Sequence, residues 1–245
     1  MTNILTFSFT TIPDIASGRR LYDLDGLSDK EVANIMFHLR RQETAGSDLL
    51  KPHLQKIICM SAVLRTDEEV KVWSLGSDTD DEKAKLQEFY SCIEKHTPDL
   101  ISWNGRQQEL PILNYRTLLH GVSAPTYWGG AEGEGLWHLA LAENLACEQS
   151  DAIAPLNEVA IMLGFTNETK TESAHAWDSY QQNNLSAISE ECDENALKIY
   201  LIYLRHELMR GTLTSEHYDT ECELVRESLL KSEQSHMQSF LHGWS

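Results

Sequence analysis

The sequence lacks an excess of positive charge. It has 20 Lys and Arg residues against 38 Asp and Glu residues, which gives a formal net charge of −18 at pH 7. Proteins that bind nucleic acids usually gain affinity from Lys and Arg side chains that displace phosphate counterions. The chain therefore has no global attraction for DNA or RNA. The net charge does not exclude a local basic groove. It also does not exclude a nuclease whose carboxylates hold divalent metal ions.

Long apolar runs and paired cysteines are also missing. No run approaches the roughly 20 apolar residues that cross a bilayer, so we expect no membrane partner. The first seven residues do not resemble a signal peptide. The five cysteines are odd in number and include no Cys-x-x-Cys pair. This usage favours reduced thiols and a cytoplasmic protein.

What is present is ordinary for a globular chain. The 245 residues are 41% hydrophobic and 24% charged, which is enough for a sizeable core. There is no linker-like run and no internal repeat. We therefore expect a single domain over residues 1–245.

Strand patterns are concentrated in the first 105 residues, and helical patterns dominate afterwards. Apolar and β-branched runs predict a strand over 4–9, a hairpin over 56–64 and 70–75, and a strand over 99–104. A capping box at Ser28 and Glu31 predicts a helix that ends near Arg41. Helical spacing follows over 80–96, 136–147, 185–209 and from 215 onward, and Pro155 and Gly164 bracket a further helix. The order predicts the α/β class, with a mixed central sheet and helices on both faces.

Three segments carry recognisable motifs. Residues 7–14 read Phe-Ser-Phe-Thr-Thr-Ile-Pro-Asp, residues 100–111 read Leu-Ile-Ser-Trp-Asn-Gly-Arg-Gln-Gln-Glu-Leu-Pro, and residues 191–197 read Glu-Cys-Asp-Glu-Asn-Ala-Leu. In this order they resemble the three motifs of the DnaQ-like (DEDD) 3'–5' exonuclease superfamily. The nearest resemblance is to a predicted exonuclease family similar to the proofreading domain of family B DNA polymerases. The resemblance covers nearly the whole chain and implies an RNase H-like fold.

Members of that superfamily cleave phosphodiester bonds with two divalent metal ions held by four carboxylates. By the resemblance, the carboxylate positions are Ser8 and Thr10 in the first motif, Glu109 in the second and Asn195 in the third. Glu191 stands where a Tyr or His would orient the attacking water. Hydroxyls and amides are weak ligands for Mg²⁺ or Mn²⁺. We therefore expect that catalysis is lost and that no metal cofactor binds.

Two groups of residues keep other interpretations open. Glu109 and Glu191 could form a sparse single-metal site, because Glu191 and Asn195 share one helix face, and only in that case would Mg or Mn be bound. Asn104 and Arg106 belong to the turn after the strand over 99–104. In that turn Arg106 either reaches a nucleic-acid phosphate or pairs with a neighbouring acid.

Four tryptophans and two acids have simpler expected roles. Asp193 and Glu194 are expected on a solvated helix face, because at 100° per residue they point away from Asn195. The tryptophans are expected to pack in the core rather than to stack on bases, and they are Trp103, Trp128, Trp137 and Trp177.

Three functions are compatible with this sequence. The leading hypothesis is a non-catalytic exonuclease homologue that binds a protein partner, or single-stranded DNA or RNA weakly. The second is an active metal-dependent 3'–5' exonuclease with a rearranged site. The third is a structural or oligomer-forming protein, and the sequence leaves the oligomeric state open.

Overall fold

One mixed sheet organises the protein. The computed structural model describes residues 3–44, 46–76, 81–129, 137–166 and 176–244. Within these ranges five strands lie in the order β3-β2-β1-β4-β5. β2 runs antiparallel to β1 and β3, whereas β4 is parallel to both β1 and β5. The strands are β1 (Ile4–Pro13), β2 (Gln55–Arg65), β3 (Val70–Ser74), β4 (Asp99–Ser102) and β5 (His138–Ala140).

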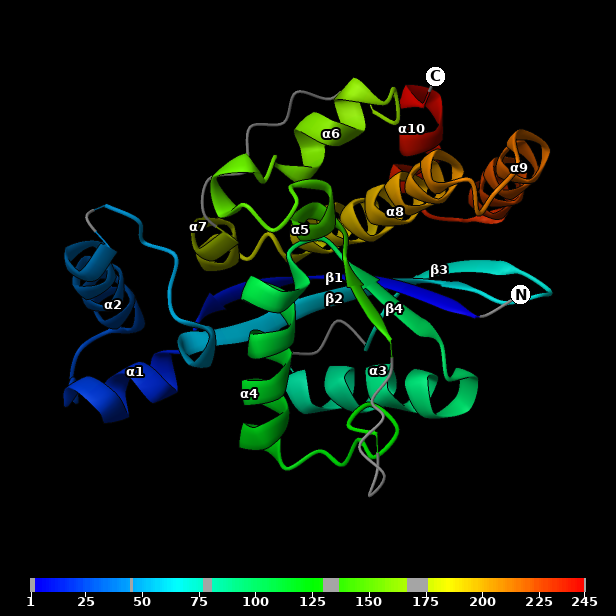
Figure 1. Ribbon diagram of the computed structural model, residues 1–245. Coiled ribbons are helices and arrows are strands. Elements are labelled where there is room, and N and C mark those ends of the chain that lie inside the picture. The colour runs from blue at the N-terminus through cyan, green and yellow to red at the C-terminus, as the bar shows by residue number, and fades with distance from the viewer. Residues whose placement is uncertain (1–2, 45, 77–80, 130–136, 167–175, 245) are drawn as a thin grey trace.

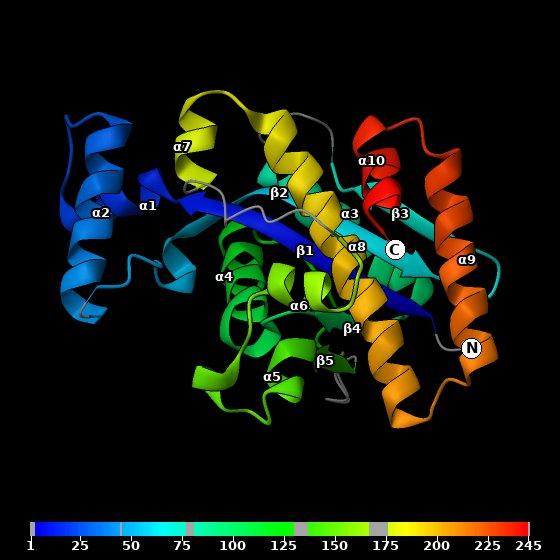
Figure 2. The same cartoon turned by 90° about the horizontal axis from the view of Figure 1, so that it is seen from above.

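Helices cover both faces of the sheet, as Figure 1 shows. On one face lie α3 (Glu82–His96) and α4 (Leu110–His120). The other face carries α5 (Leu141–Leu145), α6 (Leu156–Met162), α7 (Ala176–Gln181), α8 (Leu185–Arg210), α9 (Ser215–Lys231) and α10 (Ser235–Gly243). Figure 2 shows α8 crossing over β1 and β2. This architecture is the RNase H-like α/β fold, so the predicted fold class is confirmed.

The side-chain alternation of β1 divides the core into two layers. Leu5 and Phe7 pack against α3 and α4, whereas Ile4 belongs to the cluster that includes the buried residues of α8. Successive side chains of a strand point to opposite faces of the sheet. A central strand can bury the side chains on both faces only when helices cover both sides of the sheet. The sequence of β1 therefore requires the two helical layers.

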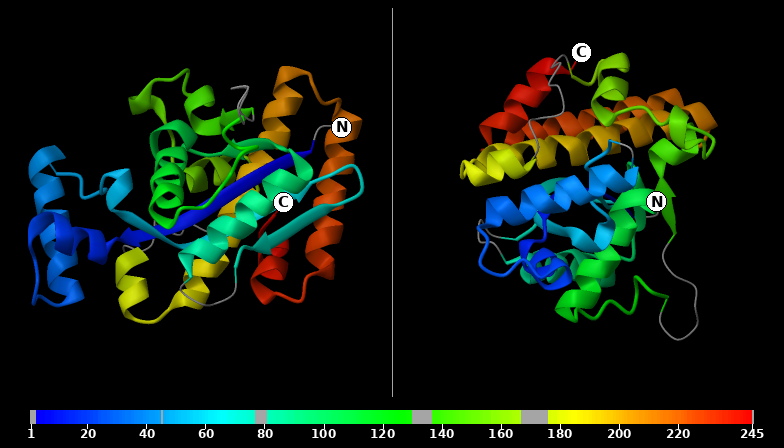
Figure 3. Two further views of the ribbon diagram at one scale, coloured as in Figure 1. Left: turned by 90° about the horizontal axis from the view of Figure 1, so that it is seen from below. Right: turned by 90° about the vertical axis from the view of Figure 1, so that its left-hand side faces the viewer.

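Two helices extend the molecule beyond one end of β1 and β2 (Figure 3). These are α1 (Ile15–Tyr22) and α2 (Asp29–Thr44). Asp14 caps α1 by accepting a hydrogen bond from the Ser17 N–H at 3.1 Å. The predicted capping box at the start of α2 is confirmed, because the Ser28 N–H donates to Glu31 at 2.7 Å and the Glu31 N–H donates to the Ser28 hydroxyl at 3.3 Å.

A buried charge network ties the helices α3 and α4 to the end of β1. The Arg116 guanidinium donates to both oxygens of Glu82, at 2.8 and 2.6 Å, and to Asp14 at 2.5 Å. Burial alone would raise the pKa of Asp14, but the hydrogen bonds from Arg116 and Ser17 outweigh it and lower that pKa. The network fixes one corner of the fold from three separate chain segments.

A second buried pair joins β2 to the C-terminal helices. Arg65 donates to both oxygens of Glu221 in α9, at 2.7 and 2.8 Å. The Tyr200 hydroxyl of α8 also donates to Glu221, at 3.2 Å. The bidentate geometry fixes the position of α9 relative to the sheet.

Two predicted helices differ from the structure. The helix expected over 136–147 starts outside the described residues, and its described part forms β5 first and becomes helical only at α5. β5 pairs with β4, and a short parallel strand buried on both faces gives an apolar run without period two. The final helix expected from residue 215 is two helices, α9 and α10, because the chain is extended at Ser232 and turns back toward α8. None of the helices in the described ranges is long and apolar enough to cross a membrane.

Candidate functional site

β1 and α8 meet on one face of the sheet. Side chains alternate along the strand, so Thr6, Ser8 and Thr10 share the face toward α8. The Cys192 thiol of α8 donates to the Ser8 carbonyl oxygen at 3.4 Å. Asn195 follows about one turn later in the same helix. The structure thus places the first-motif position Ser8 beside the segment of α8 that carries the third motif.

The second motif forms the turn between β4 and α4. Residues Gly105–Glu109 make a single π-helical turn, η2. A side chain on Gly105 would lie 2.2 Å from the His138 ring and 2.5 Å from the Ser102 hydroxyl, so only glycine fits there. The turn carries Glu109 back toward its own start, where the Asn104 N–H donates to Glu109 Oε1 at 3.1 Å.

Glu143 and Glu148 hold the Arg106 side of this turn. Glu143 Oε1 accepts hydrogen bonds from the N–H groups of Arg106 at 3.0 Å and Gln107 at 3.1 Å. The Arg106 guanidinium pairs with Glu148 at 2.7 Å, and both side chains are exposed. Arg106 therefore has an acidic neighbour in this structure, which is one of its two expected roles, and contact with a phosphate stays a prediction.

A cleft of about 610 Å³ opens beside Asn104 and Glu109. Its walls come from the end of β1, the segment before η1 (Pro52–Leu54), the η2 turn, the segment before α6 and the start of α7. Ser8, Thr10, Arg106, Glu191 and Asn195 are not among its lining residues. Of the residues singled out from the sequence, the described cleft therefore contains Asn104, Glu109, Trp103 and Trp177.

Two residues that line this cleft each have a buried polar atom without a hydrogen-bond partner within the described part of the chain. These atoms are Glu109 Oε2 and Asn104 Oδ1. Burial raises the pKa of Glu109, the hydrogen bond from the Asn104 N–H lowers it, and the nearby Glu143 carboxylate raises it, so that the pKa is about 7. Glu109 thus lies in an environment that opposes its negative charge.

The comparison with known families agrees with this geometry. Residues 47–244 match the family described as a predicted 3'-5' exonuclease related to the exonuclease domain of PolB. The chain belongs to this family. A search of curated proteins found no match. The matched range contains the second and third motifs of the exonuclease family, whereas Ser8 and Thr10 precede it.

The donor set does not suit the two metal ions of an exonuclease site. At the motif positions stand two hydroxyls, one carboxamide and one carboxyl, and hard divalent cations need anionic oxygen ligands. In the described ranges no three His, Cys, Asp or Glu side chains are grouped so that they could hold a metal. The residues at these four positions therefore lack three of the four anionic ligands that the metal pair of an exonuclease site takes.

We expect the Glu109→Gln variant to be more stable than the wild type at pH 8 but not at pH 5. Glu109 has a folded-state pKa of about 7 and a reference value of 4.5, so folding favours its neutral form. The contribution of Glu109 to the free energy of unfolding of the wild type is therefore highest below about pH 4.5, where Glu109 is neutral, and it falls as the pH rises to 7. A shift of this size corresponds to about 3 kcal/mol. Urea unfolding at both pH values measures the difference in unfolding free energy between variant and wild type, and the exposed Glu158→Gln variant is the control.

The tryptophans divide into two groups. Trp103 and Trp177 are buried, as expected, and both line the cleft. Trp128 and Trp137 are 54% and 49% exposed, so the expected core packing is wrong for these two. The contribution of Trp177 was not visible from the sequence, because its helix reaches β1 only through tertiary packing.

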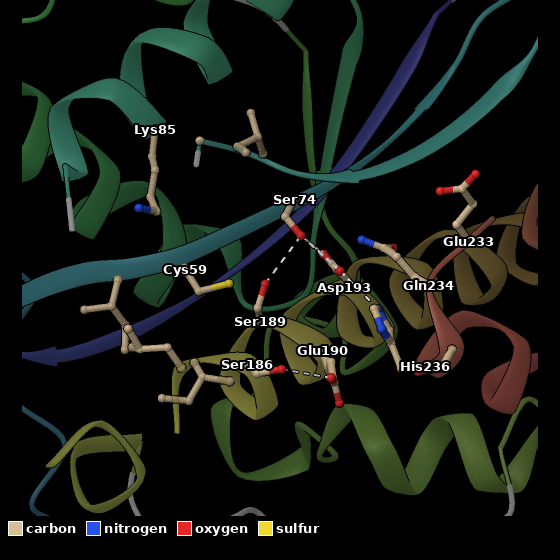
Figure 4. A pocket seen from close by; sticks show the side chains of 16 residues that line it. Cys59, Ser74, Lys85, Ser186, Ser189, Glu190, Asp193, Glu233, Gln234 and His236 are labelled. Carbon is tan, nitrogen blue, oxygen red and sulfur yellow. Dashed lines mark hydrogen bonds and ion pairs between the residues drawn. The ribbon is translucent and has the colours of Figure 1, made fainter. Parts of the chain in front are cut away.

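Asp193 and Glu194 are not on a solvated face, which corrects the sequence prediction. Both are buried, because β2, β3, α9 and α10 surround α8. Asp193 accepts hydrogen bonds from Ser61, from Ser74 at 2.8 Å and from His236 of α10 at 3.2 Å. The hydrogen bond to Asp193 raises the pKa of His236. Figure 4 shows Asp193, Ser74 and His236 at a second cavity of about 610 Å³.

Proposed function

We propose that this member of the exonuclease family is a non-catalytic binding module. The observation that carries the proposal is the set of side chains at the four carboxylate positions. Three of the four cannot carry a negative charge, and the fourth, Glu109, is held where burial opposes ionisation. The cleft beside Glu109 supports a remaining role in binding, because it keeps a volume of about 610 Å³.

A protein partner fits the cleft better than a nucleic acid does. Among its described lining residues there is no Lys or Arg, whereas Asp48 and Glu109 are acidic. Phosphate groups gain their affinity from positive side chains, and the chain as a whole carries a net charge of −18. We further propose a cytoplasmic location, which the five free cysteines support.

Incubation with 3'-ended single-stranded DNA and RNA, in Mg²⁺ and in Mn²⁺, tests the loss of catalysis. We expect no shortening of either substrate under conditions in which a 3'–5' exonuclease active on that substrate degrades it. Processive degradation that the Glu109→Ala variant abolishes would contradict the proposal and favour a rearranged active site. A salt-dependent DNA titration separates a nucleic-acid-binding module from a protein-binding one, and a size-exclusion mass well above that of one chain would favour a purely oligomer-forming protein.

A further inference from the structure

Two of the five cysteines lie together between the sheet and α8. Cys192 of α8 donates its thiol hydrogen to the carbonyl oxygen of Ser8 at 3.4 Å, and Ser8 pairs with Ser61 across the ladder of β1 and β2. Cys59 lies two residues before Ser61, so both side chains point to the same face, and Ser61 donates to Asp193 of α8. The Cys59 and Cys192 side chains therefore meet in one buried cluster.

The two thiols differ in access. Cys59 is 7% exposed and lines the cavity of about 610 Å³ that also contains Ser189 and His236, whereas Cys192 is fully buried. Figure 4 shows the Cys59 sulfur at the wall of that cavity, pointing toward Ser189. A water-sized reagent in the cavity can therefore reach Cys59, and Cys192 lies behind it.

The two thiols also differ in acidity. The Cys192 S–H, which rests on the Ser8 carbonyl, can turn toward Cys59, and that hydrogen bond lowers the pKa of Cys59 against the effect of burial. The Ser189 hydroxyl adds to the lowering, whereas the Asp193 carboxylate opposes it. Burial and the hydrogen bond with Cys59 raise the pKa of Cys192 well above its ordinary value. Because the thiolate is the nucleophile in thiol oxidation, Cys59 is the thiol that reacts first.

We propose that Cys59 and Cys192 form a dithiol that reduces hydroperoxides and closes into a disulfide. The Cys59 sulfur attacks one oxygen of the hydroperoxide, and the O–O bond breaks. The sulfur becomes a sulfenic acid, and the other oxygen leaves with the thiol proton as an alcohol, or as water when the reagent is hydrogen peroxide. The Cys192 sulfur then attacks the Cys59 sulfur, the S–O bond breaks, and the hydroxide leaves with the Cys192 proton as water. The two sulfurs together supply the two electrons that reduce the peroxide.

The disulfide would join β2 to α8 at the first-motif strand. Its formation takes the Cys192 thiol hydrogen away from the Ser8 carbonyl. A dithiol reductant restores both thiols by exchange with the disulfide. A disulfide that forms and is reduced again is compatible with the cytoplasmic location proposed above.

Peptide mapping of the whole chain tests this assignment. The fully reduced protein is treated with one equivalent of hydrogen peroxide at pH 7, the remaining thiols are blocked with N-ethylmaleimide, and proteolytic peptides are identified by mass spectrometry. We expect a disulfide between the Cys59 and Cys192 peptides, with the loss of two hydrogen atoms. The exposed Cys147 is the internal control and should be oxidised about tenfold more slowly. In urea this preference should disappear, because it depends on the fold.

Three variants separate the two steps. Cys192→Ala removes the second thiol, so oxidation should stop at a Cys59 sulfenic acid that dimedone labels. Cys59→Ala removes the first thiol, and Cys192 should then stay unoxidised. Cys222→Ala removes a buried thiol of another helix and should leave the disulfide yield unchanged.

Three results with the wild type overturn the inference, and they hold whether or not the variants fold. The first is oxidation of Cys147 before Cys59, the second is pairing of Cys59 with a cysteine other than Cys192, and the third is the absence of any disulfide. Nuclease activity of the same sample would overturn the proposed function and leave this inference as it stands.

Discussion

The Arg116→Met variant is expected to lose about 3–5 kcal/mol of unfolding free energy. The Arg116 side chain is 4% exposed, and its partners Glu82 and Asp14 are 2% and 7% exposed. Methionine keeps much of the volume but removes the guanidinium from two buried carboxylates, of which Glu82 keeps, among the described donors, only the Ile57 N–H at 2.6 Å and the His120 ring at 2.8 Å. A charge left unpaired in the interior is far more costly than the intact pair is favourable. Urea unfolding at pH 7 measures the loss.

The exposed pair at Arg106 provides the matched control. Arg106 and Glu148 are 60% and 73% exposed, so Arg106→Met should cost less than about 1 kcal/mol. Adding Glu82→Gln to Arg116→Met removes one uncompensated charge, and the double variant should lose less than the sum of the single losses. Equal losses for Arg116→Met and Arg106→Met would show that the buried network does not stabilise this corner of the fold.

Restoring the carboxylates is expected to create a metal site. The variant Ser8→Asp, Thr10→Glu, Glu109→Asp and Asn195→Asp places four acids at the family positions. Without metal their mutual repulsion should lower the melting temperature below that of the wild type. Mn²⁺ should then raise it, because a ligand at 100 times its Kd adds about 2.7 kcal/mol to the folded state. The wild-type melting temperature should not respond to Mn²⁺.

Size and charge can be separated in this experiment. The amide variant Ser8→Asn, Thr10→Gln and Glu109→Asn, with Asn195 kept, has nearly the same side-chain volumes and no carboxylate. It should show no response to Mn²⁺. If the acidic variant also fails to respond while remaining folded, the four positions do not converge, and the assignment of the first and third motifs to one site is wrong.

The sequence predicted those parts of the fold that local signals determine. Capping at Ser28 and Glu31, the hairpin of β2 and β3, and the helix before Gly164 depend on residues a few positions apart, and the structure confirms them. β5 was missed because a strand of three residues, two of them buried, gives no periodicity, and its partner strand β4 lies about 38 residues away in sequence.

The candidate site was predictable only in part, because some of its residues are far apart in sequence and meet only in the folded chain. The second motif drew attention to Asn104 and Glu109, and both line the cleft. The segment over 48–50 and the helix α7 carry no motif, and only folding brings them to the same wall. The burial of Asp193 was missed because a helical wheel shows directions around one helix but not how many neighbours surround it.

The pair between Arg65 and Glu221 has a consequence for how the protein is made. The two residues are separated by 156 positions, which at about 5–20 residues per second corresponds to roughly 8–30 seconds of translation. Throughout that interval the Arg65 side chain of β2, which is buried in the finished fold, has no Glu221 carboxylate to pair with. The hairpin face that α8 and α9 later cover is open to the solvent for the same time. A chain that stops before Glu221 therefore leaves Arg65 without its counterion and this face of the hairpin uncovered.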